Sequence, residues 1–399
     1  MKFKASPTES QKKILEQCFG ATRWIYNNML ALRDRSYKEF GISINLQDTK
    51  TLLSELKSEE ETLWLGKIPS QPLQESVIDL DNAYKRFFNQ GFGYPKRRFK
   101  DDAQSFRLPQ PKLKFKKDEA KAWIFIPNFK IWIRFDLHRK ISGEIKGATV
   151  IKDRSGKYFV SFVVKEKAKV VKPVEGEIGI DLGLKDFAIL SNGEKLGHPN
   201  FLSKSEKRLK HLQRSVSRKV KGSKNRKRAR LKLAKLHEKI RMQRSDYLHK
   251  LSRKIVDENQ VIAMETLKVK NMVKNPKLAK AISDSGWGMF VSMMKYKSEW
   301  SGRSLRLIDQ WSPSTKMCGE CGFINETITL SDREWTCESC CAHHDRDINA
   351  AKNILKIGRD TPEYKPVEKL ASGMLQKKQA KVGSKKQELK VSTADQRSA

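Results

Sequence analysis

This sequence of 399 residues contains no long hydrophobic run. No apolar stretch approaches the roughly 20 residues that a helix needs to cross a bilayer. The opening segment, residues 1–7, lacks the apolar core of a secretory signal. Basic residues are spread along the whole chain, and no amphipathic segment is suited to lie on a lipid surface. These absences predict a cytoplasmic protein with no membrane partner.

Two motifs of phosphate and strand-transfer chemistry are also absent. No G-x₄-G-K-[ST] loop occurs, so chemistry driven by ATP is unsupported. None of the seven histidines is separated from another by one residue, so a His-hydrophobe-His nicking site with a tyrosine nucleophile is not present. A transposase that itself joins strands is therefore a weak hypothesis.

Cysteine is scarce outside one short segment, because five of the six cysteines lie between Cys318 and Cys341. This clustering indicates a metal site rather than a distributed disulfide framework. Two C-x₂-C pairs have the spacing of a zinc ribbon with four thiolate ligands: Cys318, Cys321, Cys337 and Cys340. Cys341 could replace Cys340 as the fourth ligand, and His343 and His344 could compete. A closed site of this kind predicts one structural Zn²⁺ ion.

Acidic residues are few beside basic ones. The chain has 46 Asp and Glu against 82 Lys and Arg, which gives a formal net charge of +36. Such an excess repels itself unless a polyanion neutralises it, so nucleic acid is the predicted partner. The alternatives are a membrane-surface protein or a soluble basic protein without that role.

Two segments concentrate the positive charge. Residues 219–230 are basic on every helical face, which predicts phosphate contacts along a duplex, although a solvated helix is the alternative. Residues 94–107 interleave cations with aromatics that could stack on bases, whereas Phe99 and Phe106 could instead anchor a β-barrel core. The candidate nucleic-acid contacts are Lys96, Arg97, Arg98, Lys100, Arg107, Lys224, Arg226, Lys227, Arg228 and Arg230.

Hydrophobic periodicity predicts a helical segment, a set of strands and then a mixed region. Ser6-Pro7-Thr8-Glu9 has the form of a capping box with Ser6 as the N-cap of the first helix. The predicted helices of the first segment continue around residues 49–57 and 72–90. Short strands at 123–126, 130–135, 148–151 and 158–164 predict a small barrel or sandwich. Beyond Pro173, strands mixed with helices fit an α/β sheet, with a long basic helical region at 203–257 and helices at 281–302 and 347–357.

Three acidic residues occupy the ends of predicted apolar elements. Asp181 closes the strand 178–181, Glu265 closes a strand that starts at residue 261, and Asp347 opens the last helix. Carboxylates in such positions are unfavourable unless a cation or a donor meets them. Together they would hold Mg²⁺, and two ions about 4 Å apart catalyse phosphodiester hydrolysis. The alternative is three unrelated acids paired with Lys, Arg or backbone amides.

Several motifs follow one another in a fixed order along the chain. They are Phe19-Gly-Ala-Thr-Arg-Trp-Ile-Tyr-Asn-Asn, Phe99-Lys with Gln104-Ser-Phe-Arg, Gly179-Ile-Asp-Leu-Gly, Met264-Glu-Thr-Leu, Ser283-Asp-Ser-Gly-Trp, Pro313-Ser-Thr-Lys, and Cys337-x-x-Cys340 leading into Asp345-Arg-Asp-Ile-Asn-Ala-Ala-Lys-Asn-Ile. With these residues the chain resembles the TnpB family over nearly all of residues 1–390. Members of this family are nucleases of bacterial and archaeal insertion sequences, related to the type V CRISPR effectors.

The resemblance implies an α/β plus β-barrel architecture. Its parts are an RNase H-like (RuvC) nuclease domain with an inserted zinc ribbon, a small β-barrel wedge domain and a helical recognition domain. The expected boundaries are 1–8 and 91–172 for the discontinuous wedge barrel, 9–90 for the recognition domain, 173–311 and 342–360 for the nuclease domain, 312–341 for the zinc-ribbon insert that binds target nucleic acid, and 361–399 for a disordered basic tail.

The resemblance also implies site residues. In the family's D-x-D-x-N pattern the catalytic acid matches Asp347, with Asp345 as the second candidate. Asp347 is expected to hold two catalytic Mg²⁺ ions with Asp181 and Glu265. Arg333 resembles a family arginine near the scissile phosphate. The sequence departs from the family at Cys341, where a glycine is usual.

The implied activity is RNA-guided cleavage of double-stranded DNA. Family members bind a structured guide RNA from the transposon end, recognise a short motif beside the target, and cut both strands in one nuclease site. One protein per RNA and an association with the nucleoid are expected. The alternative is a nuclease-silent, RNA-guided repressor, against which the three intact acids count.

Overall fold

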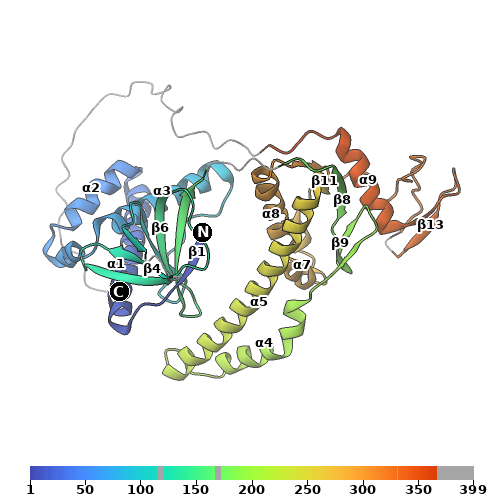
Figure 1. Ribbon diagram of the computed structural model, residues 1–399. Helices are drawn as coiled ribbons and strands as arrows, with labels where there is room; N and C mark the ends of the chain where they lie inside the picture. The colour runs from blue at the N-terminus through green and yellow to red at the C-terminus, as the bar shows by residue number, and fades with distance from the viewer. Residues whose placement is uncertain (116–120, 167–171, 330, 366–399) are drawn as a thin grey trace.

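The computed structural model describes residues 1–115, 121–166, 172–329 and 331–365. They form two bodies, each built on its own sheet, with a long helical hairpin projecting between them (Figure 1). Most of the predicted disordered tail, residues 366–399, lies outside the described residues. No helix among the described residues is long and apolar enough to cross a membrane.

The first body consists of a curled antiparallel sheet covered by helices. Its elements are β1 (Lys2–Ala5), α1 (Glu9–Phe40), α2 (Leu46–Leu56), the 3₁₀ helix η1 (Glu60–Lys67), α3 (Ser70–Gln90), β2 (Gln104–Leu108), β3 (Leu113–Phe115), β4 (Lys121–Ile126), β5 (Ile131–Asp136), β6 (Glu144–Lys152) and β7 (Tyr158–Lys165). The strand order is β2-β6-β7-β1-β5-β4-β3. The strand nearest the N-terminus therefore occupies the middle of the sheet, between β7 and β5.

The first helix begins later than the sequence predicts. Thr8 is the N-cap, and its side chain and that of Gln11 form a capping box with each other's backbone N–H groups. Ser6 was the wrong choice because its own N–H bonds to the carbonyl of Arg134 and so extends the pairing of β1 with β5. The sheet therefore determines where the helix starts.

Aromatic rings fill the core of the first body. Phe3, Phe135 and Phe162 lie with ring centroids between 5.3 and 5.9 Å apart. Phe106 is 3% exposed and packs on Phe19 of α1, whereas Phe99 is 65% exposed. Phe106 therefore anchors the core, whereas the exposed Phe99 does not, and stacking of Phe99 on a base stays a prediction.

The long basic region forms a helical hairpin rather than one rod. Helix α4 (Phe201–Ser217) and helix α5 (Lys224–Glu258) are joined by a turn in which Gly222 has φ of +86°. Apolar contacts at Leu209, Leu236 and Ile240 hold the two helices together.

The second body has a mixed sheet between two helical layers. Its strands and helices are β8 (Gly176–Asp181), β9 (Asp186–Leu190), β10 (Lys195–Gly197), β11 (Asn259–Glu265), α6 (Val269–Met272), α7 (Ala279–Ser285), α8 (Trp287–Trp300), β12 (Ser304–Ile308), β13 (Glu334–Thr336), β14 (His343–Asp345) and α9 (Arg346–Asp360). The order is β10-β9-β8-β11-β12, with β8, β11 and β12 parallel. Met264 faces the core shared with α5 and α8, while the adjacent Ala263 packs with Ile354 of α9.

Two boundaries of the second body differ from the predictions. The helix expected at 281–302 is divided by Gly286, whose φ of +72° ends α7 before α8 begins. The last helix starts at Arg346, because Asp345 caps its N-terminus, and it extends to Asp360.

Candidate functional site

Two strands bring two of the predicted acids to one edge of the second sheet. Asp181 is the last residue of β8, and Glu265 is the last residue of β11. The strands are parallel neighbours, with Met264 opposite Ile180, so both acids lie at the same end of the sheet. The carboxyl edge of parallel strands is where α/β proteins commonly bind their ligands.

Helix α9 carries the third acid, Asp347, in its first turn. The helix lies against β8 so closely that a Cβ added to Gly179 would be 2.1 Å from the carbonyl oxygen of Ala351. The glycine in Gly179-Ile-Asp181 therefore has a packing reason: it lets α9 approach the strand that ends in Asp181.

Asp345, the second candidate for the third acid, has a different environment. Its Oδ1 accepts hydrogen bonds from the N–H groups of Asp347 and Ile348, each 3.0 Å long. Its Oδ2 accepts from Lys195 Nζ at 2.6 Å. Burial opposes ionisation here, but these donors hold the pKa of Asp345 below its ordinary value. Asp345 is thus a helix cap, whereas the charge of Asp347 contributes to the raised pKa of Asp181.

The electrostatics connect the three acids. Burial, followed by repulsion from the carboxylates of Glu265 and Asp347, raises the pKa of Asp181 to about 7, against the opposing charge of Arg346. Burial also raises the pKa of Glu265, and a hydrogen bond from Ser314 opposes that rise. Ionised carboxylates in such surroundings are unfavourable without a positive partner. This donor set of carboxylate oxygens fits a hard divalent cation such as Mg²⁺.

The carboxylates are less tightly grouped than a formed metal site. Among the described residues, the only group of three or more His, Cys, Asp or Glu whose ligand atoms all lie within 4.8 Å of one another is a cysteine cluster. Both oxygens of Asp347 are engaged by guanidinium groups: Oδ1 accepts from Arg346 at 2.8 Å and Oδ2 from Arg333 at 3.3 Å. Binding of a cation by all three acids therefore requires some side-chain rotation.

Sequence reasoning missed two residues that contact these acids. Ser314 Oγ donates to Glu265 Oε1 at 2.6 Å, and the buried Arg346 donates to Asp347. Both lie in motifs that carry the family resemblance, Pro313-Ser-Thr-Lys and Asp345-Arg-Asp. Their roles depend on which acid they face, which the motifs alone do not reveal. Arg333, by contrast, was predicted near the site, and it does contact Asp347.

The raised pKa of Asp181 predicts a pH-dependent stability. The ordinary value is 3.8 and the folded value is about 7, so the metal-free fold loses stability as pH rises from about 4 to 7, and the loss is complete above 7. We expect Asp181→Asn to raise the melting temperature of the metal-free protein by several degrees at pH 8, and by less at pH 5. Thermal unfolding in a chelator measures this; an equal change at both pH values would contradict the assignment.

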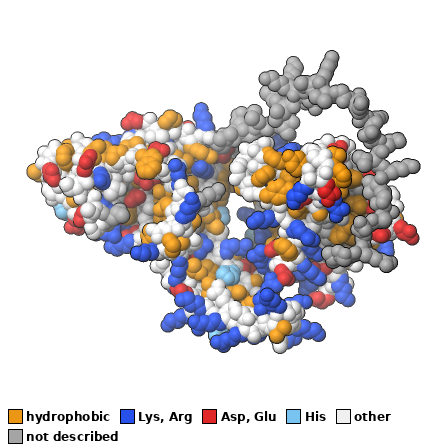
Figure 2. Space-filling model, turned by 180° about the vertical axis from the view of Figure 1, so that it is seen from behind, with side chains coloured by type: hydrophobic (Ala, Val, Ile, Leu, Met, Phe, Trp, Pro, Cys, Tyr) orange, Lys and Arg blue, Asp and Glu red, His pale blue; other side chains and the backbone are white. Residues whose placement is uncertain are grey.

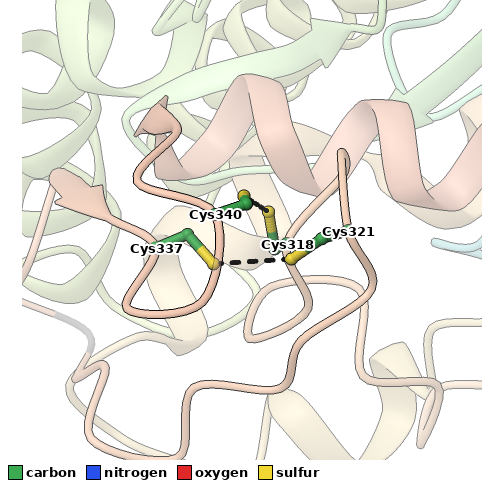
Figure 3. A group of neighbouring side chains, drawn as sticks. All are labelled: Cys318, Cys321, Cys337 and Cys340. Atoms are coloured by element: carbon green, nitrogen blue, oxygen red, sulfur yellow. Dashed lines mark hydrogen bonds between the residues drawn. The ribbon is translucent and has the colours of Figure 1, made fainter.

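Four cysteines converge in the segment between β12 and α9. The sulfur atoms of Cys318, Cys321, Cys337 and Cys340 all lie within 4.8 Å of one another, and they point toward a common centre (Figure 3). Two of the Sγ–Sγ distances, Cys318–Cys340 and Cys321–Cys337, are 3.6 Å. A tetrahedral ion with bonds of about 2.3 Å needs sulfur separations of roughly 3.8 Å. These four residues could therefore hold one metal ion with little movement.

Cys341 and His344, the alternative metal ligands, differ in how close they lie to the four cysteines. Cys341 is exposed and has φ of +57°, the left-handed conformation that glycine adopts most easily. That conformation accounts for the glycine usual here, and the cysteine lies outside the cluster. His344 is closer, with Nε2 3.0 Å from Cys318 Sγ, and its ring packs on Trp335. The expected four thiolates thus form the cluster, with His344 beside it.

The predicted nucleic-acid contacts divide into paired and exposed residues. Arg98 pairs with Asp79 and Arg107 with Glu75 in the first body. Arg226 is used inside the hairpin, where it donates to the carbonyls of Val216 and Lys219. Arg107 and Arg230 are also exposed, but each pairs with an acidic residue. The exposed members outside these ion pairs, which remain candidates for phosphate contacts, are Lys96, Arg97, Lys100, Lys224, Lys227 and Arg228.

The hairpin is also tied to the first body by ion pairs. Arg230, another predicted contact, pairs with Asp101 at 2.5 Å, and Lys157 pairs with Glu238 at 2.9 Å. Lys and Arg side chains gather over the hairpin, at the bottom of the view in Figure 2. A phosphate backbone can neutralise this surface.

Three family models match the chain. One described as "Probable transposase" (OrfB_IS605) matches residues 161–276, and "Cas12f1-like, TNB domain" matches residues 287–354, which include the four clustered cysteines. A third, described as a helix-turn-helix domain, matches residues 1–41. In the structure this last stretch forms the strand β1 and the single 32-residue helix α1.

Relatives match over most of their length. A protein of Streptomyces pristinaespiralis named "Putative RNA-guided DNA endonuclease" is 37% identical over 90% of this chain and 88% of its own. The Escherichia coli K12 protein named "Putative RNA-guided DNA endonuclease InsQ" is 31% identical over 90% of this chain and 91% of its own. A mimivirus protein named "TnpB-like protein L79" is 23% identical over 91% of this chain and 74% of its own.

The family model and the relatives together place the chain in a class of proteins associated with insertion sequences. The solved structure of a Cas12f1–sgRNA–target DNA complex shares this fold, with a TM-score of 0.55 and 16% identity over 87% of this chain and 83% of that chain. The chain belongs to the TnpB family.

Proposed function

We propose that this protein is an RNA-guided endonuclease that cuts double-stranded DNA in a single metal-dependent RuvC-like site. The observation that carries the proposal is the electrostatic connection of Asp181, Glu265 and Asp347 at the carboxyl edge of a parallel sheet. The names of the family relatives support guidance by RNA.

The proposed chemistry assigns each residue a role. Asp181, Glu265 and Asp347 would hold Mg²⁺, which supplies a water activated at neutral pH and positive charge at the scissile phosphate. Ser314 orients Glu265 through its 2.6 Å hydrogen bond. Arg333, half exposed beside Asp347, is placed to stabilise negative charge on the phosphate.

The finer parts of the proposal concern the domains and partners. We assign the first body to the wedge barrel and the recognition helices, the second body to the RuvC-like domain, and the cysteine cluster to a structural zinc ribbon. Recognition of a short target-adjacent motif belongs to the protein, and the remaining target sequence is read by pairing with a guide RNA from the transposon end.

A reconstituted cleavage assay tests the proposal. The protein is expressed with the RNA encoded at the end of its insertion sequence, and the RNA that copurifies is sequenced. Plasmids carrying the matching target beside a randomised flank are then incubated with the complex. We expect linear product with Mg²⁺ and none in a chelator, and a restricted set of flanks among the cut plasmids.

Two results would contradict the proposal in different ways. Specific binding of the target without cutting, with Mg²⁺ present, would indicate the RNA-guided repressor instead. Cutting that needs no RNA would remove guidance from the proposal while retaining the nuclease site.

A further inference from the structure

A cavity of about 690 Å³ opens in the first body, away from the acids and the cysteines. Residues of α1, of η1 and Ile68 after it, and Arg97 line the cavity. Gly20 and Ala21 leave room for the hollow, because neither carries a bulky side chain. The lining residues are Gln17, Gly20, Ala21, Arg23, Trp24, Asn27, Asn28, Ala31, Trp64, Lys67, Ile68 and Arg97.

All charged residues that line this cavity are basic. Three cations, Arg23, Lys67 and Arg97, line the cavity, and none of its twelve residues is acidic. A larger cavity of about 820 Å³ beside the hairpin is also rich in basic residues, but it includes Asp101, Asp153 and Glu238. Those carboxylates would repel a phosphate, whereas the first cavity offers only cations, amides and apolar surface to an anion.

Two tryptophans provide flat surface in the same cavity. Trp24 and Trp64 meet edge to face, with ring centroids 5.7 Å apart. Trp24 is half-buried against the core, and Trp64 is 39% exposed. A partly exposed indole beside cations is the combination that stacks on an unpaired base while a neighbouring charge meets its phosphate.

The walls of the cavity are fixed by local hydrogen bonds. Asn27 exchanges two hydrogen bonds with the backbone of Arg98, at 2.8 and 2.9 Å, and so holds the segment that carries Arg97. Arg23 donates to Gln104 at 2.6 Å. These bonds occupy Asn27 and Arg23, while the exposed Gln17, Lys67 and Arg97 present their polar ends at the cavity.

We propose that this cavity binds one unpaired nucleotide, with its base against Trp64 and its phosphate near Arg97 and Lys67. The inference rests on the proposed function only for the source of the nucleotide, which is either the guide RNA or a displaced DNA strand. Both share the same chemistry of base and phosphate, and a ribose 2′-OH distinguishes them.

The test compares variants of the full-length protein from which copurified RNA has been removed, so that a guide segment does not already fill the cavity. Trp64→Ala should weaken binding of a single-stranded oligonucleotide about tenfold, in line with the loss of one stacked base. Trp64→Phe should restore most of that affinity. Trp300→Ala is the matched control, because Trp300 is also exposed, at 69%, but lies on α8 in the other body. Melting temperatures exclude misfolding as the cause.

Two further arms identify the ligand. Ribo- and deoxyribo-oligonucleotides of the same sequence, substituted with a photoreactive iodinated pyrimidine, should cross-link to the peptide that contains Trp64. The oligonucleotide with the higher cross-linking yield identifies RNA or DNA as the source of the bound nucleotide. Arg97→Ala should weaken binding and reduce the slope of log affinity against log salt concentration by about one released counterion. Trp64→Ala should leave that slope unchanged.

The outcomes separate the two proposals. If Trp64→Ala and Arg97→Ala bind both oligonucleotides as tightly as the wild type, the cavity has no such role, and guided cleavage by the same preparation would leave the proposed function standing. If the wild type neither retains RNA nor cuts DNA, the proposed function fails, and cross-linking at Trp64 still decides the nucleotide site.

Discussion

Replacing Asp181 with alanine is expected to lower the rate of guided DNA cleavage on the order of 10³-fold. Asp181 is the acid that feels both Glu265 and Asp347 most directly, so its loss removes the carboxylate around which the cation site would form. Loss of metal binding removes several kcal/mol of transition-state stabilisation. Each 1.4 kcal/mol or so that is lost lowers the rate tenfold. Single-turnover cleavage of a labelled target measures it.

Guided binding should survive the same substitution, because in the proposed function the target is held by pairing with the guide RNA and not by this acid. Asp360→Ala is the matched control: it also removes an aspartate from the second body, but at the exposed end of α9. It should cut at the wild-type rate. Undiminished cutting by Asp181→Ala would reject the site, and equal loss in both variants would indicate a general loss of structure.

Replacing Cys337 with serine is expected to abolish both zinc binding and the folded state of the insert that precedes α9. Among the described residues of the insert, the buried apolar core consists of Cys318, Ile328, Trp335 and Cys337, and two of these four are proposed ligands. So small a core does not stabilise a fold without a metal. Structural zinc contributes about 10–16 kcal/mol in small metal-dependent domains. Metal content per chain, measured on the purified protein, should fall from one zinc to none.

Cleavage should fall with the zinc, although zinc does no chemistry in the proposal. Ser314 and Arg333, which contact Glu265 and Asp347, both come from the insert. Cys341→Ser is the matched control, because Cys341 is exposed and outside the cluster. It should keep one zinc and full activity. Loss of zinc from Cys341→Ser but not from Cys337→Ser would reverse the ligand assignment.

The candidate acids were predictable because their signal is local. An apolar strand that ends in a carboxylate is visible in Ile178-Gly-Ile-Asp181 and in the strand before Glu265. The preference for Asp347 over Asp345 came from the D-x-D-x-N pattern and stays a prediction, to which the structure adds that Asp345 caps α9. The cysteine pairs were equally local, and the structure brings Cys340, not Cys341, into the cluster.

Other features depend on partners that are distant in sequence. Ser6 looks like a helix cap until Arg134 is seen to pair with it. Arg226 looks like a phosphate contact until the hairpin turn brings two carbonyls to its guanidinium group. Motifs do not encode such pairings, so density of charge overstates the number of cations available to nucleic acid.

The central position of β1 has a consequence for synthesis of the chain. This strand leaves the ribosome long before its neighbour β7, which begins at Tyr158. At typical translation speeds the two are separated by on the order of ten seconds. During that interval β1 lacks its partner β7, and the hydrogen-bonding edge that β7 will cover remains open to other chains. Folding of the first body is therefore delayed until β7 has emerged, whatever helices form before then.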